Sequence, residues 1–186
     1  MTQDFLVNHF LVAMPSLNDQ NFHKSVVFIC EHNAQSALGI IINKPTSIVL
    51  NDIFKQLAIT AEDENIARQP VYQGGPVQTE RGFVIHEPPG HWESSLILGG
   101  RLAVTSSRDV LACMARGQGP QYNFVALGYA GWGAGQLENE LASNSWLSTP
   151  ADGSIIFKTP VEQRWQAAAQ LLGVDIALLT EDAGHA

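Results

Sequence analysis

Cys30 and His32 are the two residues whose types best suit nucleophilic chemistry. They follow the apolar run VVFI, and β-branched residues at this density predict a strand from Ser25 to His32. Alternate residues of a strand point to the same face, so we expect the thiol and the imidazole on one side. A charged imidazole beside a thiol favours a reactive thiolate. The alternative is that Cys30 is a small buried core residue.

A second candidate site is the segment QGGPVQTERG. Gly74 and Gly75, followed by Pro76, predict a tight turn that exposes backbone amides beside Arg81. Amides and a guanidinium together suit a carboxylate or a phosphate. The alternative, which we favour, is a purely structural turn with Arg81 paired to a nearby acidic residue.

The glycine-rich stretch from Leu127 to Leu147 resembles a phosphate-binding turn only superficially. Gly131 and Gly133 fit the first half of the G-x-G-x-x-G pattern, but Gln136 occupies the third glycine position. The helix expected after it carries Glu138 and Glu140 in its first turns, where carboxylates would repel a bound phosphate. We therefore interpret the glycines as a packed corner.

Two aromatic residues in this stretch have two interpretations. Tyr129 and Trp132 could be presented to a partner on an exposed surface, which we favour over a nucleotide cradle. Trp132 could instead pack against the sheet, provided that its indole N–H finds an acceptor.

Composition limits the classes of function. The chain of 186 residues carries 18 acidic and 10 basic residues without a Lys/Arg run, so direct nucleic-acid binding is disfavoured. The two cysteines and six histidines lack the spacing of a metal site, and we expect neither a metal nor another cofactor. No signal peptide and no membrane-spanning run is evident, which predicts a cytoplasmic protein without membrane contact.

The elements that position these candidates form one domain over residues 1–186. Roughly eight strands and four helices follow one another without strict alternation, which predicts an α/β or α+β fold with a mixed sheet. Strands are expected in HFLVAMP, SVVFICEH, LGIIINK, on both sides of the Gly-Gly-Pro turn, on both sides of Gly99-Gly100, in YNFVALGY and in GSIIFKT. Helices are expected in LNDIFKQLAI, SSRDVLACMARG, QLENEL and PVEQRWQAAAQLLG, with a surface loop over 60–69 and a frayed tail from Thr180.

Several long motifs closely resemble the YqgE/AlgH family of bacterial proteins. They are HFLVAMPSLNDQNFHKSVVFICEHNAQSALGIIINKP, VYQGGPVQTERGFVIH, VALGYAGWGAGQLENELASNSWL and TPVEQRWQAAAQLLG, and the likeness runs over nearly the whole chain. The resemblance implies a single compact domain with a branched, partly closed mixed sheet flanked by helices. It implies no catalytic residues, because the family is largely uncharacterised. Its name comes partly from a proposed role in transcriptional regulation of alginate production, and its ICEH motif at Ile29 to His32 supports Cys30 as a functional position.

Three functions remain open from the sequence. The favoured one is a non-enzymatic regulatory or binding protein that acts through an unknown protein or small-molecule partner. The second is a redox- or ligand-sensing module that uses Cys30. The third is a hydrolase or transferase with Cys30, His32, Arg81 and Ser106 in one pocket.

Overall fold

The predicted hairpin around Cys30 belongs to a group of four strands. In the computed structural model, which describes residues 5–183, β2 (Val26–His32) pairs antiparallel with β3 (Ser36–Ile41). On the other edge of β2 lies β1 (His9–Ala13), and β10 (Trp146–Pro150) pairs antiparallel with β1. The order of the four strands is β10-β1-β2-β3. The first and the last strand of the chain are therefore neighbours, and β10 is a strand that the sequence reasoning missed.

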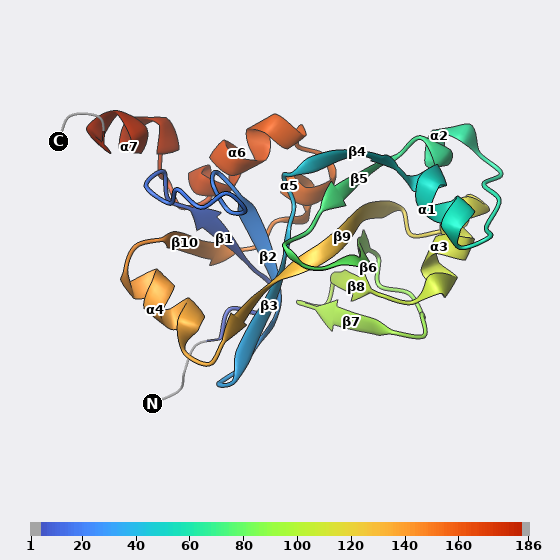
Figure 1. Ribbon diagram of the computed structural model, residues 1–186, viewed down its shortest axis with the longest axis horizontal. Helices are drawn as coiled ribbons and strands as arrows, with labels where there is room; N and C mark the ends of the chain where they lie inside the picture. Colours follow the sequence, from blue (N-terminus) through green and yellow to red (C-terminus); the bar gives the residue numbers. More distant parts are fainter. Residues whose placement is uncertain (1–4, 184–186) are drawn as a thin grey trace.

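The sheet branches at β9 (Tyr122–Gly133), the strand that crosses the middle of the molecule (Figure 1). One part of β9 pairs antiparallel with β3, and another pairs antiparallel with β6 (Val77–Glu87) and parallel with β5 (Pro70–Gln73). Outside β6 lie β8 (Leu102–Thr105) and β7 (Ser95–Leu98), and β4 (Pro45–Val49) pairs with β5. The mixed, branched sheet implied by the family resemblance is confirmed, with ten strands instead of about eight.

The first third of the glycine-rich stretch, as far as Gly133, is strand and not a turn. Residues up to Gly133 belong to β9, where pairing with β3 holds Gly131 and Gly133 extended, whereas Gly128 adopts a φ of 80°. The chain turns only at Ala134 and Gly135, before α4 (Gln136–Ala142), where Gly135 adopts a φ of 75°. This corrects the interpretation as a packed corner for Gly131 and Gly133, whose conformation inter-strand pairing decides. Gly128 does pack closely, since a Cβ there would lie 2.5 Å from the carbonyl oxygen of Gly75.

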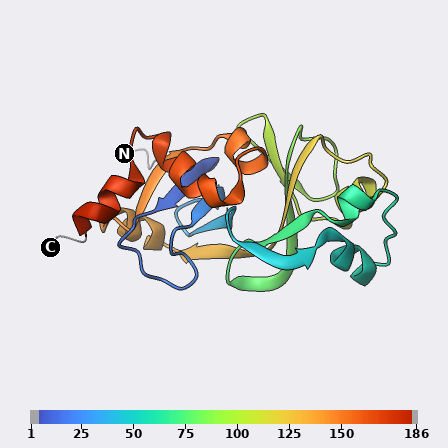
Figure 2. The same cartoon turned by 90° about the horizontal axis from the view of Figure 1, so that it is seen from above.

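Helices gather at the two ends of the molecule (Figures 1 and 2). At one end lie α1 (Leu50–Gln56), α2 (Glu64–Ala67) and α3 (Arg108–Ala115). Phe54 of α1 and Met114 of α3 pack on Val84 and Val125 of the sheet. At the other end lie α4, α6 (Arg164–Gln170) and α7 (Ile176–Ala183). A 3₁₀ turn over Val161–Gln163 precedes α6.

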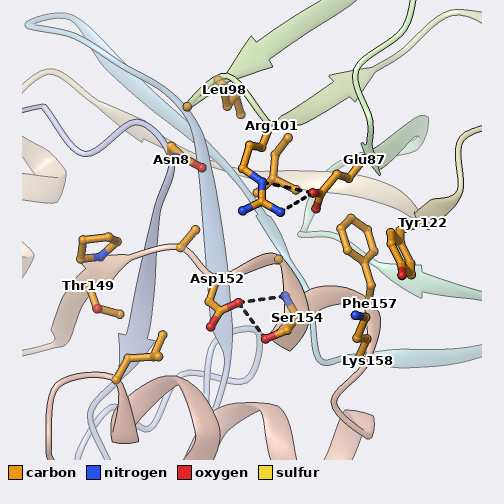
Figure 3. A pocket seen from close by; sticks show the side chains of 16 residues that line it. Asn8, Glu87, Leu98, Arg101, Tyr122, Thr149, Asp152, Ser154, Phe157 and Lys158 are labelled. Atoms are coloured by element: carbon orange, nitrogen blue, oxygen red, sulfur yellow. Dashed lines mark hydrogen bonds and ion pairs between the residues drawn. The ribbon is translucent and has the colours of Figure 1, made fainter.

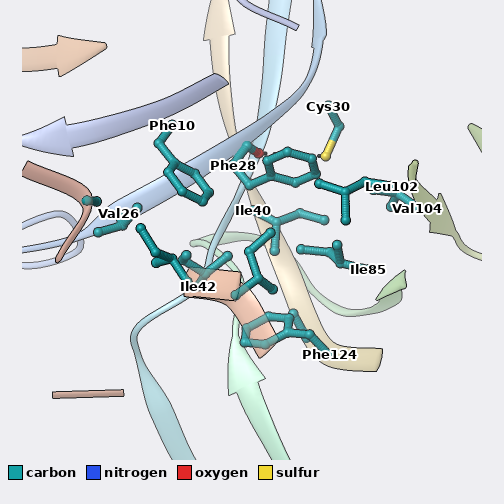
Figure 4. Packing of buried hydrophobic residues seen from close by; sticks show 14 of the residues in the cluster. Phe10, Val26, Phe28, Cys30, Ile40, Ile42, Ile85, Leu102, Val104 and Phe124 are labelled. Carbon is teal, nitrogen blue, oxygen red and sulfur yellow. Dashed lines mark hydrogen bonds between the residues drawn. The ribbon is translucent and has the colours of Figure 1, made fainter. Parts of the chain in front are cut away.

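The main core lies between strands β1–β3 on one side and strands β6, β8 and β9 on the other (Figure 4). Phe10 and Phe28 come from β1 and β2, while Ile85 and Phe124 come from β6 and β9, and all are nearly or fully buried. α5 (Gly153–Phe157) and α6 cover this cluster with apolar side chains. The sheet therefore curls around one core, with α4 covering a second cluster on the opposite face of β1–β3.

Three predictions of secondary structure were wrong. The predicted strand GSIIFKT is helix α5, because Asp152 caps its first turn and two adjacent isoleucines are buried against the core. The predicted surface loop over 60–69 contains the short helix α2, capped by Asp63. The predicted frayed tail is helical to Ala183, and the last three residues, 184–186, lie outside the described part of the chain. No helix within residues 5–183 has both the length and the apolar character needed to cross a bilayer.

Candidate functional site

The Cys30 thiol lies inside the main core (Figure 4). Cys30 is 3% exposed, and its Sγ donates to the carbonyl oxygen of Phe28 at 3.6 Å. Burial raises the pKa of this thiol, and the negative charge of Glu31 raises it further. The thiol therefore stays protonated at neutral pH, which is the opposite of the activation that the sequence suggested.

A β-bulge separates Cys30 from His32. Ile29 and Glu31 pair with two consecutive residues of β3, so Cys30 is the extra residue and the alternation of faces resets after it. Glu31 lies opposite Leu38, which packs on the cluster that contains Cys30. His32 follows on the other face, so the expectation that the thiol and the imidazole share a face is wrong.

The His32 ring is held by two partners of its own. Its Nδ1 accepts the backbone N–H of Leu6 at 2.9 Å, and its Nε2 lies 2.8 Å from Oε1 of Glu138 in α4. Because Nδ1 accepts a hydrogen bond, Nε2 carries the proton that is donated to Glu138. His32 thus links β2 to α4 and is not placed to act as a base on Cys30.

The Gly-Gly turn is buried against β9. The amide of Gly74 donates to the carbonyl of Leu127 at 2.7 Å, and its carbonyl accepts from the amide of Ile41 at 2.8 Å. A Cβ on Gly75 would lie 2.0 Å from the carbonyl carbon of Tyr129. The expectation of exposed amides in this turn is therefore corrected: these glycines are required by the close approach of two backbones.

Arg81 is exposed beside the turn, with its guanidinium 5.0 Å from the centre of the Phe83 ring. No acidic partner holds it among residues 5–183, so the pairing that we favoured from the sequence is not formed. Arg81 does share a small cavity of about 210 Å³ with Cys30 and Ser106. Three of the four residues proposed for an enzyme pocket are thus neighbours, and His32 is excluded from the lining.

Tyr129 and Trp132 lie on opposite faces of β9. Tyr129 is partly buried and packs edge-on against Phe83 in the main cluster. Trp132 is 5% exposed and packs with Trp146 and Leu137 in the second cluster. The two rings therefore do not form the shared exposed surface that the sequence suggested, and Trp132 is a core residue.

The residues that line one larger cleft were not singled out from the sequence. A cavity of about 720 Å³ opens between the end of β6, the β7–β8 turn and the segment from β10 into α5 (Figure 3). The cleft is lined by four charged side chains, Glu87, Arg101, Asp152 and Lys158. Glu87 ends β6, Arg101 lies in the β7–β8 turn, and Asp152 and Lys158 flank α5. These residues lack a recognisable motif, and only the fold brings them together.

The charged groups of this cleft contact neighbouring residues of the chain. Arg101 donates from Nε and Nη2 to the same oxygen of Glu87, at 3.2 and 2.9 Å. Asp152 Oδ1 accepts from the amide and the hydroxyl of Ser154, at 2.9 and 2.7 Å. Lys158 lies 5.0 Å from the centre of the Tyr122 ring. Asp152 is therefore fixed by two hydrogen bonds, whereas the Arg101 side chain is 83% exposed and its ion pair with Glu87 is a surface contact.

Asn8 and Gly99 fix the edge of the cleft. Both have a φ of 62°, and a Cβ on Gly99 would lie 2.2 Å from the side-chain Nδ2 atom of Asn8. The Asn8 Oδ1 atom is buried and has no hydrogen-bond partner in the part of the chain that the structure describes. The β7–β8 turn is therefore packed directly on the segment before β1.

The single sequence signal for this site was the capping residue Asp152. The order Asp-Gly-Ser before an apolar pair is typical of a helix start, yet two isoleucines in a short run indicated a strand. No group of three or more metal-ligating side chains occurs within the described residues 5–183.

Comparisons with known proteins place this geometry in a family. Residues 10–177 match the AlgH-like family. A UPF0301 protein of Methylococcus capsulatus is 53% identical over 98% of this chain and 97% of its own length. Another, from Thioalkalivibrio sulfidiphilus, is 56% identical over 96% of both chains.

Two solved structures share the fold. The solution structure of the AlgH protein from Pseudomonas aeruginosa superposes with a TM-score of 0.81, at 46% identity and with full coverage of both chains. The protein DIP2367 of Corynebacterium diphtheriae superposes with a TM-score of 0.77 at 18% identity, over 96% of this chain and 93% of its own, which shows similarity of fold alone.

Proposed function

The chain belongs to the AlgH-like family, and we propose that it acts as a non-enzymatic binding protein that takes a small ligand in the cleft between the β7–β8 turn and α5. The observation that carries this proposal is that charged groups of both signs, brought from separate elements, line that cleft. Ligand occupancy would then alter contacts with a partner protein in the cytoplasm, in keeping with the proposed regulatory role from which the family partly takes its name.

The size and lining of the cleft support a ligand site. A volume of about 720 Å³ lies within the range of roughly 300–1,000 Å³ that small-molecule sites occupy. The lining combines charged groups with the apolar side chains of Leu98, Leu102 and Phe157. Such a mixture provides both the apolar contact and the few polar anchors that small-molecule binding uses.

Binding is favoured over catalysis by the state of the best nucleophile. The Cys30 thiol has a raised pKa, and the one histidine near it in sequence projects from the other face of β2. A nucleophile needs a base within hydrogen-bond reach or a lowered pKa, and Cys30 has neither in this arrangement.

The proposal is tested by screening small metabolites for an increase in the melting temperature. A compound that binds the folded state raises that temperature by mass action. We expect at least one compound to stabilise the native sequence and to lose its effect in Arg101→Gln. The matched control is Arg68→Gln, because Arg68 also forms an exposed ion pair with a glutamate, at 3.0 Å, but lies outside the lining of the cleft.

Two results would contradict the proposal. One is a screen in which no compound stabilises the protein. The other is a stabilising compound whose effect is the same in Arg101→Gln and in Arg68→Gln, since such a compound binds elsewhere.

A further inference from the structure

We propose that the ligand of this cleft is a zwitterion, namely an apolar amino acid or a dipeptide of such residues. The carboxylate would contact Arg101, the ammonium would contact Asp152, and the apolar side chain would lie on the cleft wall. This inference rests on the proposed function and names the chemical class of its ligand.

The balance of charge in the cleft favours a ligand that carries both signs. Two acidic side chains, Glu87 and Asp152, and two basic ones, Arg101 and Lys158, line it, although the whole chain has a net charge of −8. A polyanion would meet two carboxylates, and a cation would meet a guanidinium and an ammonium. A zwitterion can place each of its charges beside the opposite one.

Arg101 and Asp152 each keep one atom available for a ligand. Both bonds from Arg101 to Glu87 use Nε and Nη2, so Nη1 has no partner within residues 5–183. Ser154 occupies only Oδ1 of Asp152, which leaves Oδ2 without a partner in the same described part. Figure 3 shows the two side chains on opposite sides of the cleft. Each side chain therefore has one polar atom that a ligand could contact without breaking an existing hydrogen bond.

The cleft wall suits an apolar side chain. Leu98 and Leu102 lie against the core, and Phe157 stacks on Tyr122 with ring centres 5.8 Å apart. Leu171 also lines the cleft and is 42% exposed. A bound leucyl or phenylalanyl side chain would cover this apolar surface, which is favourable because apolar area is removed from water.

The test uses isothermal titration calorimetry with the dipeptide leucyl-phenylalanine as the probe. Two derivatives remove one charge each: the N-acetyl dipeptide lacks the ammonium, and the dipeptide amide lacks the carboxylate. Asp152→Asn removes the charge on the protein side but keeps an oxygen that can cap α5. Arg101→Gln removes the opposite charge, and Arg68→Gln serves as the control.

We expect each loss of a charge to weaken binding about tenfold, since hydrogen bonds to charged groups are stronger than those between neutral groups. The effects should also be paired. Asp152→Asn should weaken the binding of the free dipeptide but leave the binding of the N-acetyl form unchanged. Arg101→Gln should weaken the binding of the free dipeptide but leave the binding of the amide unchanged. Arg68→Gln should bind all three as the native protein does.

The inference is overturned if the N-acetyl dipeptide or the amide binds as tightly as the free dipeptide, or if the paired pattern is absent. If the dipeptide does not bind but a metabolite that is not an apolar zwitterion binds and depends on Arg101, the zwitterion is wrong and the proposed function stands. If neither the dipeptide nor any screened metabolite binds, both fail.

Discussion

Replacing Gly75 by alanine tests whether the Gly-Gly turn is a structural contact or a ligand site. A Cβ at this position would lie 2.0 and 2.1 Å from the carbonyl carbon and oxygen of Tyr129, and 2.4 Å from the amide nitrogen of Ala130. Real Cβ contacts are essentially never shorter than 3.0 Å, so the turn and β9 must separate by about 1 Å. β9 resists this shift because it is paired with β3, β5 and β6.

We expect Gly75→Ala to lower the free energy of unfolding by about 3 kcal/mol, at the upper end of the usual cost of overpacking. For a chain of this size, each kcal/mol lowers the melting temperature by about 2–4 °C, so the loss should be about 6–12 °C. Urea unfolding followed by tryptophan fluorescence measures the first quantity, and calorimetry measures the second.

The control is Gly133→Ala, at the other end of β9. A Cβ on Gly133 would have no atom within 4 Å, and this glycine is exposed. We expect a change of less than about 0.5 kcal/mol there, as for most surface substitutions. If Gly75→Ala is no more destabilising than this control, the close approach of the turn to β9 does not stabilise the fold and the argument is refuted.

Three further predictions concern buried side chains. Because burial raises its pKa, Cys30 should react with a maleimide only after denaturation, in a Cys113→Ser background; rapid labelling of the native protein would contradict this. Burial lowers the pKa of His86 below its ordinary value of 6.5, so the unfolded state takes up the proton first and stability should fall as the pH drops below about 6.5. His86→Gln should make this decline shallower in urea titrations at about pH 7.5 and pH 5.5, and an unchanged decline would assign it to other groups. Trp132→Ala should cost about 3–5 kcal/mol of unfolding free energy, and a variant as stable as the native protein would show that the ring is not part of the core.

Long periodic segments were predicted well from the sequence. The β2–β3 hairpin follows from its β-branched runs, and α1 and α3 follow from the apolar stripe and the glycine stop signal. These patterns reflect local preferences that agree with the tertiary packing. Short segments were predicted poorly, because five residues such as those of α5 do not span enough turns to reveal a period.

The site was predicted poorly for a related reason. The face to which His32 points depends on one bulge at Cys30, and a shift of one residue reverses every later side chain in a strand. Nothing in the sequence around Cys30 marks that bulge. Arg81 and Cys30 do line one small cavity, but the larger cleft escaped detection because its residues come from separate elements without a shared motif.

The sequence by itself determined the family and the mixed fold class, and it located the main strands and helices. These properties depend on composition, periodicity and long motifs, which are local along the chain. The tertiary structure alone decided that Trp132 is core, that the Gly-Gly turn is buried, and that Arg101 and Asp152 face one another across a cleft. Such facts depend on which strands pair and in what register, and distant parts of the chain fix that pairing only when they pack together.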